Sequence, residues 1–314
     1  MSGLAEGGDD QLYGGSETDN LLGDAREMSG SAAGGDDQLF GGAEADNLLG
    51  DASSMSEAAT GGNDQIFGGT GDDIITADAL SMDGLTTGGN DRLFGGTEDD
   101  TLFGDAQQLL ESAAGGDDRL FGGDGSDVLL GDAGQMHDAA TGGDDILVGG
   151  ATDLEPDVLI GDAEILAFTA RGGNDRLFGT RASDILVGDA SSMSDLARGG
   201  NDVLVGGGGN DQLYGDAVLT TSDVTRGADR FVFATDNDDD DDTIFDFEND
   251  KDVIDLRDFV GIDNIGEVRA HAQQAGADTV IDLGAAAGTS AGSDVLTIAN
   301  FSRAQLSAAD FLFS

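Results

Sequence analysis

The chain has 314 residues, of which 64 are acidic and 13 are basic, so its formal net charge is −51 at pH 7. Such an excess of carboxylates excludes nucleic acid as a partner, and it drives the chain apart unless cations neutralise it. Cysteine is absent, which excludes disulfides and thiolate metal sites.

The N-terminal segment, Met1 to Asp10, has neither the basic region nor the apolar region of a secretory signal peptide. No apolar run in the chain approaches the length that is needed to span a membrane. Taken alone, these two features indicate a cytoplasmic protein. The C-terminal segment described below reverses that interpretation.

Gly-Gly pairs recur at a fixed period along most of the chain. They begin at Gly7, Gly34, Gly61, Gly88, Gly115, Gly142, Gly172 and Gly199. The step is 27 residues, except for one step of 30, where Gly149 to Asp157 contains three extra residues. Self-similarity of this length predicts a solenoid, in which each repeat forms one coil and buries its apolar side by stacking on its neighbours.

Each repeat contains two glycine-rich turns, and a short strand follows each turn. In Gly68 to Thr76 (GGTGDDIIT), glycines occupy places one, two and four, Asp73 is at place six and Ile75 at place eight. The pattern is also complete at Gly122 to Leu130 and at Gly206 to Tyr214. Glycine accepts positive φ in the turn, and the strand directs one side chain inward. The predicted inward residues are Leu12, Leu21, Leu39, Leu48, Ile66, Ile75, Leu93, Leu102, Leu120, Leu129, Leu147, Leu159, Leu177, Leu186, Leu204 and Leu213.

One aliphatic pair per coil is a thin core, so we expect the sixth-place aspartates to contribute to stability. Stacking places them in two columns. The first column is Asp10, Asp37, Asp64, Asp91, Asp118, Asp145, Asp175 and Asp202, and the second is Asp19, Asp46, Asp73, Asp100, Asp127, Asp157, Asp184 and Asp211. Stacked carboxylates oppose folding unless divalent cations lie between them. Carboxylate and carbonyl oxygens, without His or Cys, favour Ca²⁺ as that cation.

A third set of aspartates follows the second strand, mostly within Gly-Asp-Ala. Its members are Asp24, Asp51, Asp78, Asp105, Asp132, Asp162, Asp189 and Asp216. About nine additional residues then precede the next Gly-Gly pair, and pieces such as Asp24 to Met28 predict an N-capped single helical turn that folds against the roll. For these aspartates, helix capping and calcium ligation are both open.

Residues at the ninth place form a further column, which strand alternation directs outward. They are Tyr13, Phe40, Phe67, Phe94, Phe121, Val148, Phe178, Val205 and Tyr214. We expect them to pack under the inserted segments or simply to suit a pleated surface. The alternative is a hydrophobic stripe for lateral self-association.

Some turns depart from the glycine pattern. Glu17, Glu44 and Glu98 stand at the fourth place, and Gly179 to Asp184 reads GTRASD, with Arg181 near the expected site. We expect the calcium sites at these turns to be weak or empty.

The repeats end near Gly227, which predicts a repeat domain over residues 1–227 and a C-terminal domain over residues 228–314. The C-terminal domain is predicted to be mostly β, with a helix over Ile265 to Ala275. Its predicted strands are Arg230 to Ala234, Thr243 to Phe247, Val253 to Leu256, Thr279 to Leu283 and Val295 to Ala299. For the acidic run Asp236 to Asp242, a solvated loop is favoured over a dedicated ion site.

The repeats resemble the RTX family of secreted calcium-binding proteins. That resemblance implies an all-β fold, a right-handed parallel β-roll in which calcium ions are shared between adjacent turns. The phrases GADRFVF, DTIFDF, DVIDL and DVLTIANF resemble the terminal domain that follows the roll in serralysin-type proteases and alginate epimerases. That domain would cap the open end of the solenoid. The last residues, AADFLFS, resemble the uncleaved C-terminal signal that type I secretion machinery recognises, which implies an extracellular location.

Catalysis is not expected, because His137 and His271 stand alone and neither H-E-x-x-H nor G-x-S-x-G occurs. The sequence therefore predicts a secreted calcium-binding β-roll that folds outside the cell as a matrix, surface or interaction protein. Two alternatives are a secreted effector that acts on host membranes and the separated RTX module of a larger exported enzyme.

Overall fold

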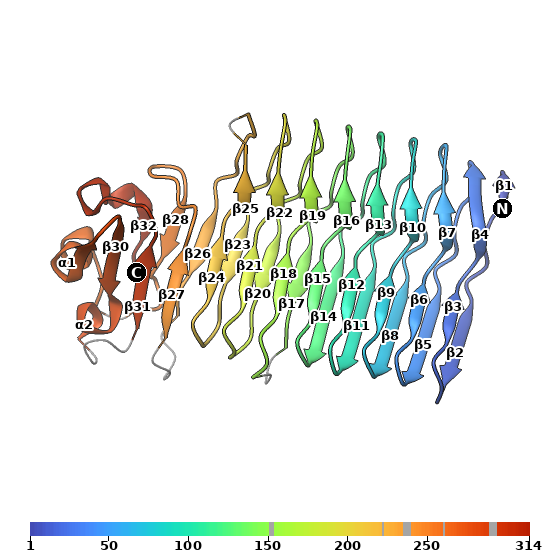
Figure 1. The fold of residues 1–314 in the computed structure, drawn as a ribbon, viewed down its shortest axis with the longest axis horizontal. Coiled ribbons are helices and arrows are strands. Elements are labelled where there is room, and N and C mark those ends of the chain that lie inside the picture. The colour runs from blue at the N-terminus through green and yellow to red at the C-terminus, as the bar shows by residue number, and fades with distance from the viewer. Residues whose placement is uncertain (151–153, 222, 235–239, 260, 289–293) are drawn as a thin grey trace.

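The computed structural model describes residues 1–150, 154–221, 223–234, 240–259, 261–288 and 294–314. The chain forms a long rod, with the N-terminus at one end and the C-terminal residues gathered at the other (Figure 1). Among the helices of the described segments, none combines the length and the apolar character that a membrane-spanning helix needs.

Each repeat contributes three strands, one to each of three sheets that run along the rod. The first sheet contains, in spatial order, β2 (Gln11–Gly15), β5 (Gln38–Ala43), β8 (Gln65–Thr70), β11 (Arg92–Thr97), β14 (Arg119–Asp124), β17 (Ile146–Val148), β20 (Arg176–Phe178), β23 (Val203–Val205), β26 (Arg230–Val232), β28 (Val253–Asp255) and β32 (Phe311–Leu312).

The second sheet contains β3 (Asn20–Leu22), β6 (Asn47–Leu49), β9 (Ile74–Thr76), β12 (Thr101–Phe103), β15 (Val128–Leu130), β18 (Val158–Ile160), β21 (Ile185–Val187), β24 (Gln212–Tyr214), β27 (Asp241–Ile244), β31 (Val295–Ile298), β30 (Asp278–Asp282) and β29 (Ala272–Ala275). The third contains β1 (Ser2–Gly3), β4 (Ala25–Gly30), β7 (Ala52–Met55), β10 (Ala79–Met82), β13 (Ala106–Leu109), β16 (Ala133–Met136), β19 (Ala163–Leu166), β22 (Ala190–Met193) and β25 (Ala217–Thr220).

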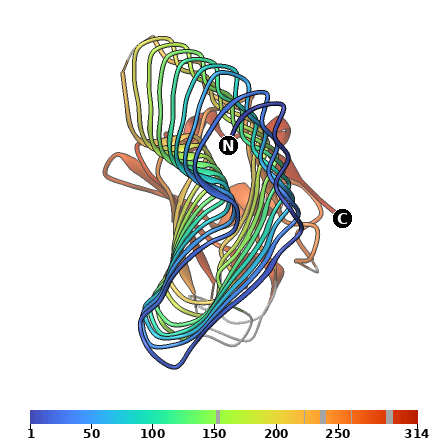
Figure 2. The same cartoon turned by 90° about the vertical axis from the view of Figure 1, so that its right-hand side faces the viewer.

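The third sheet corrects the expected helical turn after Gly-Asp-Ala. In β7 and β10, Ala52 pairs with Ala79 and Met55 pairs with Met82, in parallel register. A single helical turn would leave most of its backbone groups without partners, whereas a strand pairs with the coils on both sides. Each coil therefore has three strands, and the view along the rod in Figure 2 shows two lobes joined at a narrow waist.

The inward aliphatic residues form the main core, as predicted. Every predicted member from Leu39 to Leu213 is fully buried, while Leu12 and Leu21 are partly exposed near the N-terminal end of the rod. A second core, which the sequence analysis missed, fills the lobe of the third sheet. It contains Met28, Met55, Met82, Leu109, Met136, Leu166 and Met193, together with alanines of the same coils.

The ninth-place aromatic residues point outward from the first sheet. The rings of Tyr13, Phe40, Phe67, Phe94 and Phe121 stack with centroids 4.8–5.0 Å apart and interplanar angles of 2–6°. Tyr214 does not belong to this column, because it lies on the second sheet, where it stacks on Phe245.

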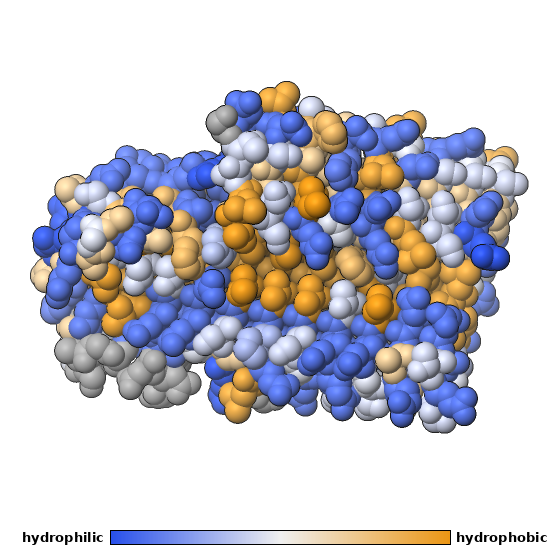
Figure 3. Space-filling model, in the orientation of Figure 1, coloured by the Kyte–Doolittle hydropathy of each residue, from blue (hydrophilic) through white to orange (hydrophobic). Residues whose placement is uncertain are grey.

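The outer face of the second sheet carries an apolar cluster of its own. Leu130, Ile160 and Val187 are buried there, and partly exposed neighbours such as Val158 and Ile185 pack against them. Figure 3 shows an apolar band along the rod, level with strands β9 to β21 of Figure 1.

The C-terminal residues continue the first and second sheets, and their apolar side chains join the main core. The predicted strands are present with bounds that differ by up to three residues. Helix α1 (Ile265–His271) ends before Ala272, because β29 pairs there with β30 in antiparallel register. The expected helix over Ile265 to Ala275 was therefore too long. Helix α2 (Leu283–Ala287) and the 3₁₀ helices η1 (Arg303–Gln305) and η2 (Ala308–Asp310) complete this region. The domain boundary after residue 227 stays a prediction.

Candidate metal centres

The first and second columns of aspartates are continuous ladders of hydrogen bonds between coils. In the first column, Asp37 Oδ1 accepts the backbone N–H of Asp10 at 2.7 Å, and Asp64 Oδ1 accepts that of Asp37 at 2.7 Å. In the second, Asp73 Oδ1 accepts the N–H of Asp46 at 2.8 Å. Each predicted sixth-place aspartate thus lies one coil from its equivalent, in the column that the sequence predicted.

The ladders extend beyond the predicted residues. Asp229 and Asp252 continue the first column, because Asp202 N–H donates to Asp229 Oδ1 and Asp229 N–H donates to Asp252 Oδ1, both at 3.0 Å. Asp242 continues the second, accepting the N–H of Asp211 at 2.9 Å. All three begin the same Asp-x-apolar phrase as the repeats, which is the signal that could have identified them.

The acidic run Asp236 to Asp242 was expected to be a solvated loop, and its last part is not. Asp240 is buried and accepts the N–H of Gly209, and Asp242 is half-buried within the second column. Residues 236–239 lie outside the described residues. The run therefore ends inside the roll.

For most aspartates of the two columns, the second carboxylate oxygen is buried and has no hydrogen-bond donor among the described residues. This holds for Oδ2 of Asp37, Asp46, Asp64, Asp73, Asp91, Asp100, Asp118, Asp145, Asp175, Asp202, Asp211 and Asp229. Burying a charged carboxylate oxygen without a hydrogen-bond donor costs on the order of several kcal/mol of folding free energy. A cation between the coils would remove that penalty.

Glycines leave room for a cation beside these oxygens. A Cβ on Gly104 would lie 1.6 Å from the carbonyl oxygen of Gly131 and 2.4 Å from Asp118 Oδ2. A Cβ on Gly68 would lie 2.3 Å from Asp73 Oδ2 and 2.6 Å from the carbonyl oxygen of Gly95. Each of these glycines thus borders a space lined by a carboxylate of its own coil and a carbonyl of the next, a donor set that fits Ca²⁺.

The third set of aspartates forms a third column along the edge where the third sheet begins. No helix lies there, so the helix-capping alternative is wrong. These side chains instead accept backbone N–H groups of the following Gly-Gly pair, as Asp51 Oδ2 does from Gly62 at 2.9 Å and Asp132 Oδ1 from Gly143 at 2.8 Å. They therefore brace the turn that returns to the first sheet.

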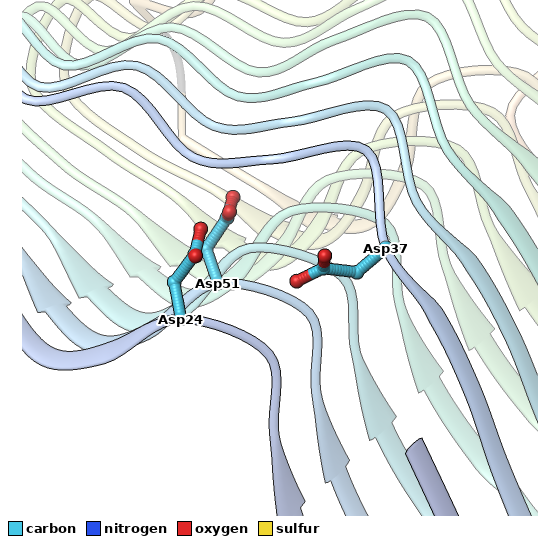
Figure 4. A group of neighbouring side chains, drawn as sticks. All are labelled: Asp24, Asp37 and Asp51. Atoms are coloured by element: carbon cyan, nitrogen blue, oxygen red, sulfur yellow. The ribbon is translucent and has the colours of Figure 1, made fainter. Parts of the chain in front are cut away.

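Carboxylates of the third column approach one another and the first column. Asp24 and Asp78 of the neighbouring coils lie close enough to Asp51 to influence its pKa, which burial raises to about 7. Oxygens of Asp24, Asp37 and Asp51 all lie within 4.8 Å of one another, and Figure 4 shows the three side chains turned toward a common space. The calcium-ligation alternative for the third column thus fits this geometry.

Burial raises the carboxyl pKa values of many aspartates in the columns, and neighbouring carboxylates raise them further. The pKa of Asp73 rises from 3.8 to about 6 and that of Asp100 to about 8, with desolvation as the main cause in both. The pKa of Asp118, which Asp91, Asp105 and Asp145 surround, lies well above its ordinary value. At neutral pH these ionised groups are therefore unfavourable in the folded chain unless cations compensate their charge.

Two of the departures from the glycine pattern keep the shape of the turn. Glu44 and Glu98 have φ values of 67° and 73°, in the left-handed region that Gly71 and Gly125 also occupy at this place. A residue with a Cβ pays about 1–2 kcal/mol there. The low occupancy expected for their calcium sites stays a prediction.

The GTRASD turn supplies its own donors. Thr180 donates from its backbone N–H and from Oγ1 to Asp184 Oδ2, at 2.6 and 2.9 Å. Asp184 Oδ2 lies 2.7 Å from the position of a Cβ on Gly179, as the equivalent oxygens do at other turns, but here it also accepts these two hydrogen bonds. This arrangement is consistent with the weak site that the sequence predicted.

Asp246 ends the third column and was missed by the sequence analysis. Its Oδ1 accepts the N–H of Gly215 at 2.7 Å, and its Oδ2 accepts those of Asp216 and Ala217 at 3.0 and 3.2 Å. Backbone donors thus satisfy this carboxylate where the third sheet stops.

A model of the family described as RTX calcium-binding nonapeptide repeat matches more than half of the chain. The matched residues are 4–25, 31–54, 58–79, 85–108, 112–135, 169–192 and 196–217. The matches include the glycine-rich turns and end before the C-terminal residues. No curated protein matches the chain.

Filling a glycine-lined space is expected to weaken the calcium-loaded rod. Gly104→Ala places a methyl group against a backbone carbonyl and a carboxylate oxygen, and should lower the free energy of unfolding in calcium by about 1–3 kcal/mol. Gly8→Ala is the matched control, because its Cβ would meet only Asp10 Oδ2, at 3.8 Å. Urea unfolding in calcium measures the free energy of unfolding of both variants. Equal values for the two variants would contradict the assignment of the space to a calcium ion.

Without metal, acidification is expected to favour the fold. The raised carboxyl pKa values mean that the folded chain binds more protons than the unfolded chain, so this stabilisation is complete below about pH 4 and is lost as pH rises through 6 to 8. Circular dichroism of the metal-depleted chain between pH 8 and pH 4 should show β-structure increasing toward acid. Loss of β-structure on acidification would contradict the expectation that protonation of the buried carboxylates stabilises the metal-free fold.

Proposed function

The chain belongs to the family of RTX calcium-binding nonapeptide repeat proteins, and we propose that it is secreted and folds outside the cell when calcium fills its aspartate columns. The observation that carries this proposal is the file of buried Oδ2 atoms without donors, such as those of Asp64, Asp91 and Asp118. Each of these oxygens faces a gap between successive coils. At neutral pH its burial there is favourable only when a cation compensates its charge.

Low calcium should leave the chain unfolded. Its columns bring carboxylates of successive coils together, and the two apolar cores are only one or two side chains wide in each coil. Extracellular calcium modules have dissociation constants of about 10⁻⁴ to 10⁻³ M, far above cytosolic calcium. Binding to the folded state alone would then shift the equilibrium toward the fold only outside the cell.

Export before folding also suits the C-terminal segment. Asp310 is buried, and its carboxylate accepts backbone N–H groups of Asp250 and Ser307 at 3.0 and 2.6 Å. Phe311 pairs with Ile254 as part of strand β32. A type I secretion machinery could therefore reach this proposed signal in the unfolded chain, but not readily in the folded one.

Outside the cell, the rod would act as a matrix, surface or interaction protein and not as an enzyme. The outer face of the first sheet supports this role. Arg92 and Arg119 are Cα partners on adjacent strands and are exposed, beside the stacked rings of Phe94 and Phe121. Neither arginine forms an ion pair in the part of the chain that the structure describes.

Adjacent like charges weaken a sheet unless something compensates them. An acidic partner would do so, and a second copy of this chain presents exposed acids such as Asp72, Glu98 and Asp99 at the same axial period. Lateral self-association through this face is therefore part of the proposed role.

A secreted effector acting on host membranes is the second candidate. The tips of the third-sheet lobe favour it, because Leu85, Phe168 and Leu196 are 68%, 50% and 60% exposed there. Calcium-dependent leakage of dye from liposomes would support the effector, and intact liposomes would support the interaction protein. The separated module of a larger exported enzyme remains the third candidate.

Folding is expected to require calcium at neutral pH. In EGTA the circular dichroism spectrum should be that of an unfolded chain, and millimolar calcium should produce β-structure, because the carboxylates repel one another until cations bind. Magnesium at the same concentration is the control, since it retains its waters and fits a protein cage poorly. A chain that is already β-structured in EGTA would refute the coupling.

Self-association is expected to depend on the arginine pair. In calcium, sedimentation velocity over a concentration series should show oligomers of the wild-type chain, and Arg119→Glu should shift them toward monomer. Arg26→Glu, at an exposed position of strand β4 in the third sheet, is the control with the same charge change. A monomer at every concentration would remove self-association from the proposed role.

A further inference from the structure

The two long edges of the roll differ in how many carboxylates each coil places there. We name the edge between the first and second sheets the plain edge, which carries the second column alone, as at Asp100. The edge where the third sheet is inserted we name the double edge, which carries the first and third columns, as at Asp118 and Asp105. Each coil therefore contributes one column aspartate at the plain edge and two at the double edge.

At the plain edge, one carboxylate oxygen per coil faces the glycine-lined space. Asp100 Oδ1 is occupied by the backbone N–H of Asp73, at 2.8 Å. Asp100 Oδ2 lies 2.3 Å from the position of a Cβ on Gly95, and the carbonyl oxygen of Gly122 lies 2.7 Å from it. The other side of this space is thus lined by a neutral carbonyl group.

At the double edge, carboxylates from successive coils converge on one glycine. A Cβ on Gly115 would lie 2.1 Å from Asp132 Oδ1 and 2.3 Å from Asp105 Oδ2. A Cβ on Gly88 would lie 1.8 Å from Asp105 Oδ1 and 2.5 Å from Asp78 Oδ2. The same pair of contacts recurs along the edge, at Gly61, Gly142 and Gly172 with their own aspartates.

Buried oxygens without donors lie along this edge in both columns, with Asp105 Oδ2 beside Gly115, Asp132 Oδ2 beside Gly142 and Asp118 Oδ2 beside Gly104. Asp105 Oδ2 and Asp132 Oδ2 of the third column, and Asp118 Oδ2 of the first, have no hydrogen-bond partner among the described residues. Their side chains are 0%, 0% and 1% exposed. Water cannot compensate their charge, so these atoms themselves indicate a ligand and distinguish the double edge from an ordinary acidic surface.

From these contacts we infer that the roll contains two classes of calcium site, and that the sites of the double edge fill at lower calcium than those of the plain edge. The inference rests on the proposed function, because it assumes that the columns bind calcium. Its physical reason is the ligand charge. Calcium affinity in oxygen sites increases with the number of charged ligands, and the double edge supplies two or three carboxylates where the plain edge supplies one.

Ions at the two edges would hold different elements of the coil together. Asp105 joins the double edge at the start of β13, and Asp118 joins it just before β14. Ions at the double edge would therefore hold the third-sheet lobe to the first sheet. Ions at the plain edge would then close the turn between β11 and β12.

Calorimetric titration of the metal-depleted full chain with calcium tests the inference. Two binding phases are expected, with dissociation constants that differ by about tenfold or more. Circular dichroism, recorded at the same calcium concentrations, should show β-structure increasing in the first phase and again in the second. A single binding phase for the wild-type chain would overturn the two classes, whatever the behaviour of any variant.

Two isosteric variants in the same coil assign the phases. Asp105→Asn should reduce the amplitude of the tight phase or weaken it severalfold, and Asp100→Asn should do the same to the weak phase only. Both residues are buried, and Asn retains the Oδ1 that accepts a backbone N–H in each case. If both substitutions altered the same calcium-binding phase, the assignment of the two phases to the two edges would be overturned. A wild-type chain that binds no calcium would instead refute the proposed function.

Discussion

The fold depends on carboxylates that are stacked inside a narrow roll. Each aspartate of the columns uses one oxygen to accept a backbone N–H from the neighbouring coil, and this bond sets the register of the stack. The other oxygen is buried beside the same column of negative charge. The side chains that align the coils therefore also oppose their association, and cations decide which effect is larger.

This balance explains why the apolar parts of the coil are small. The main core contributes one residue from each of two strands, and the Met and Ala core of the third sheet is equally narrow. Neither core is wide enough to stabilise the metal-free fold by itself, because ordering each coil costs backbone entropy at every residue. The rod is thus suited to a conditional fold, which an extracellular calcium-binding protein can use.

The places where the columns end or change show how a buried carboxylate is satisfied without a cation. Thr180 donates two hydrogen bonds to Asp184, and backbone N–H groups satisfy both oxygens of Asp246. In each case donors of the chain itself reach a carboxylate oxygen that has no donor at most other places in the columns. Those donor-free oxygens are the ones whose charge a cation would compensate.

The sequence by itself determined the period, the inward aliphatic residues and the three sets of aspartates, because a solenoid repeats its local contacts at every coil. It did not determine the third sheet, since an Ala and a Met three residues apart, as at Ala52 and Met55, suit a helical turn as well as a short strand. Only pairing with the coils on both sides decided between them. The same reason applies to Ala272–Ala275, which pairs with β30 instead of extending α1. It also applies to Asp242, whose place in the second column follows from the pairing of its strand, β27, with β24. For segments of three or four residues, hydrogen bonds to distant parts of the chain outweigh local preference.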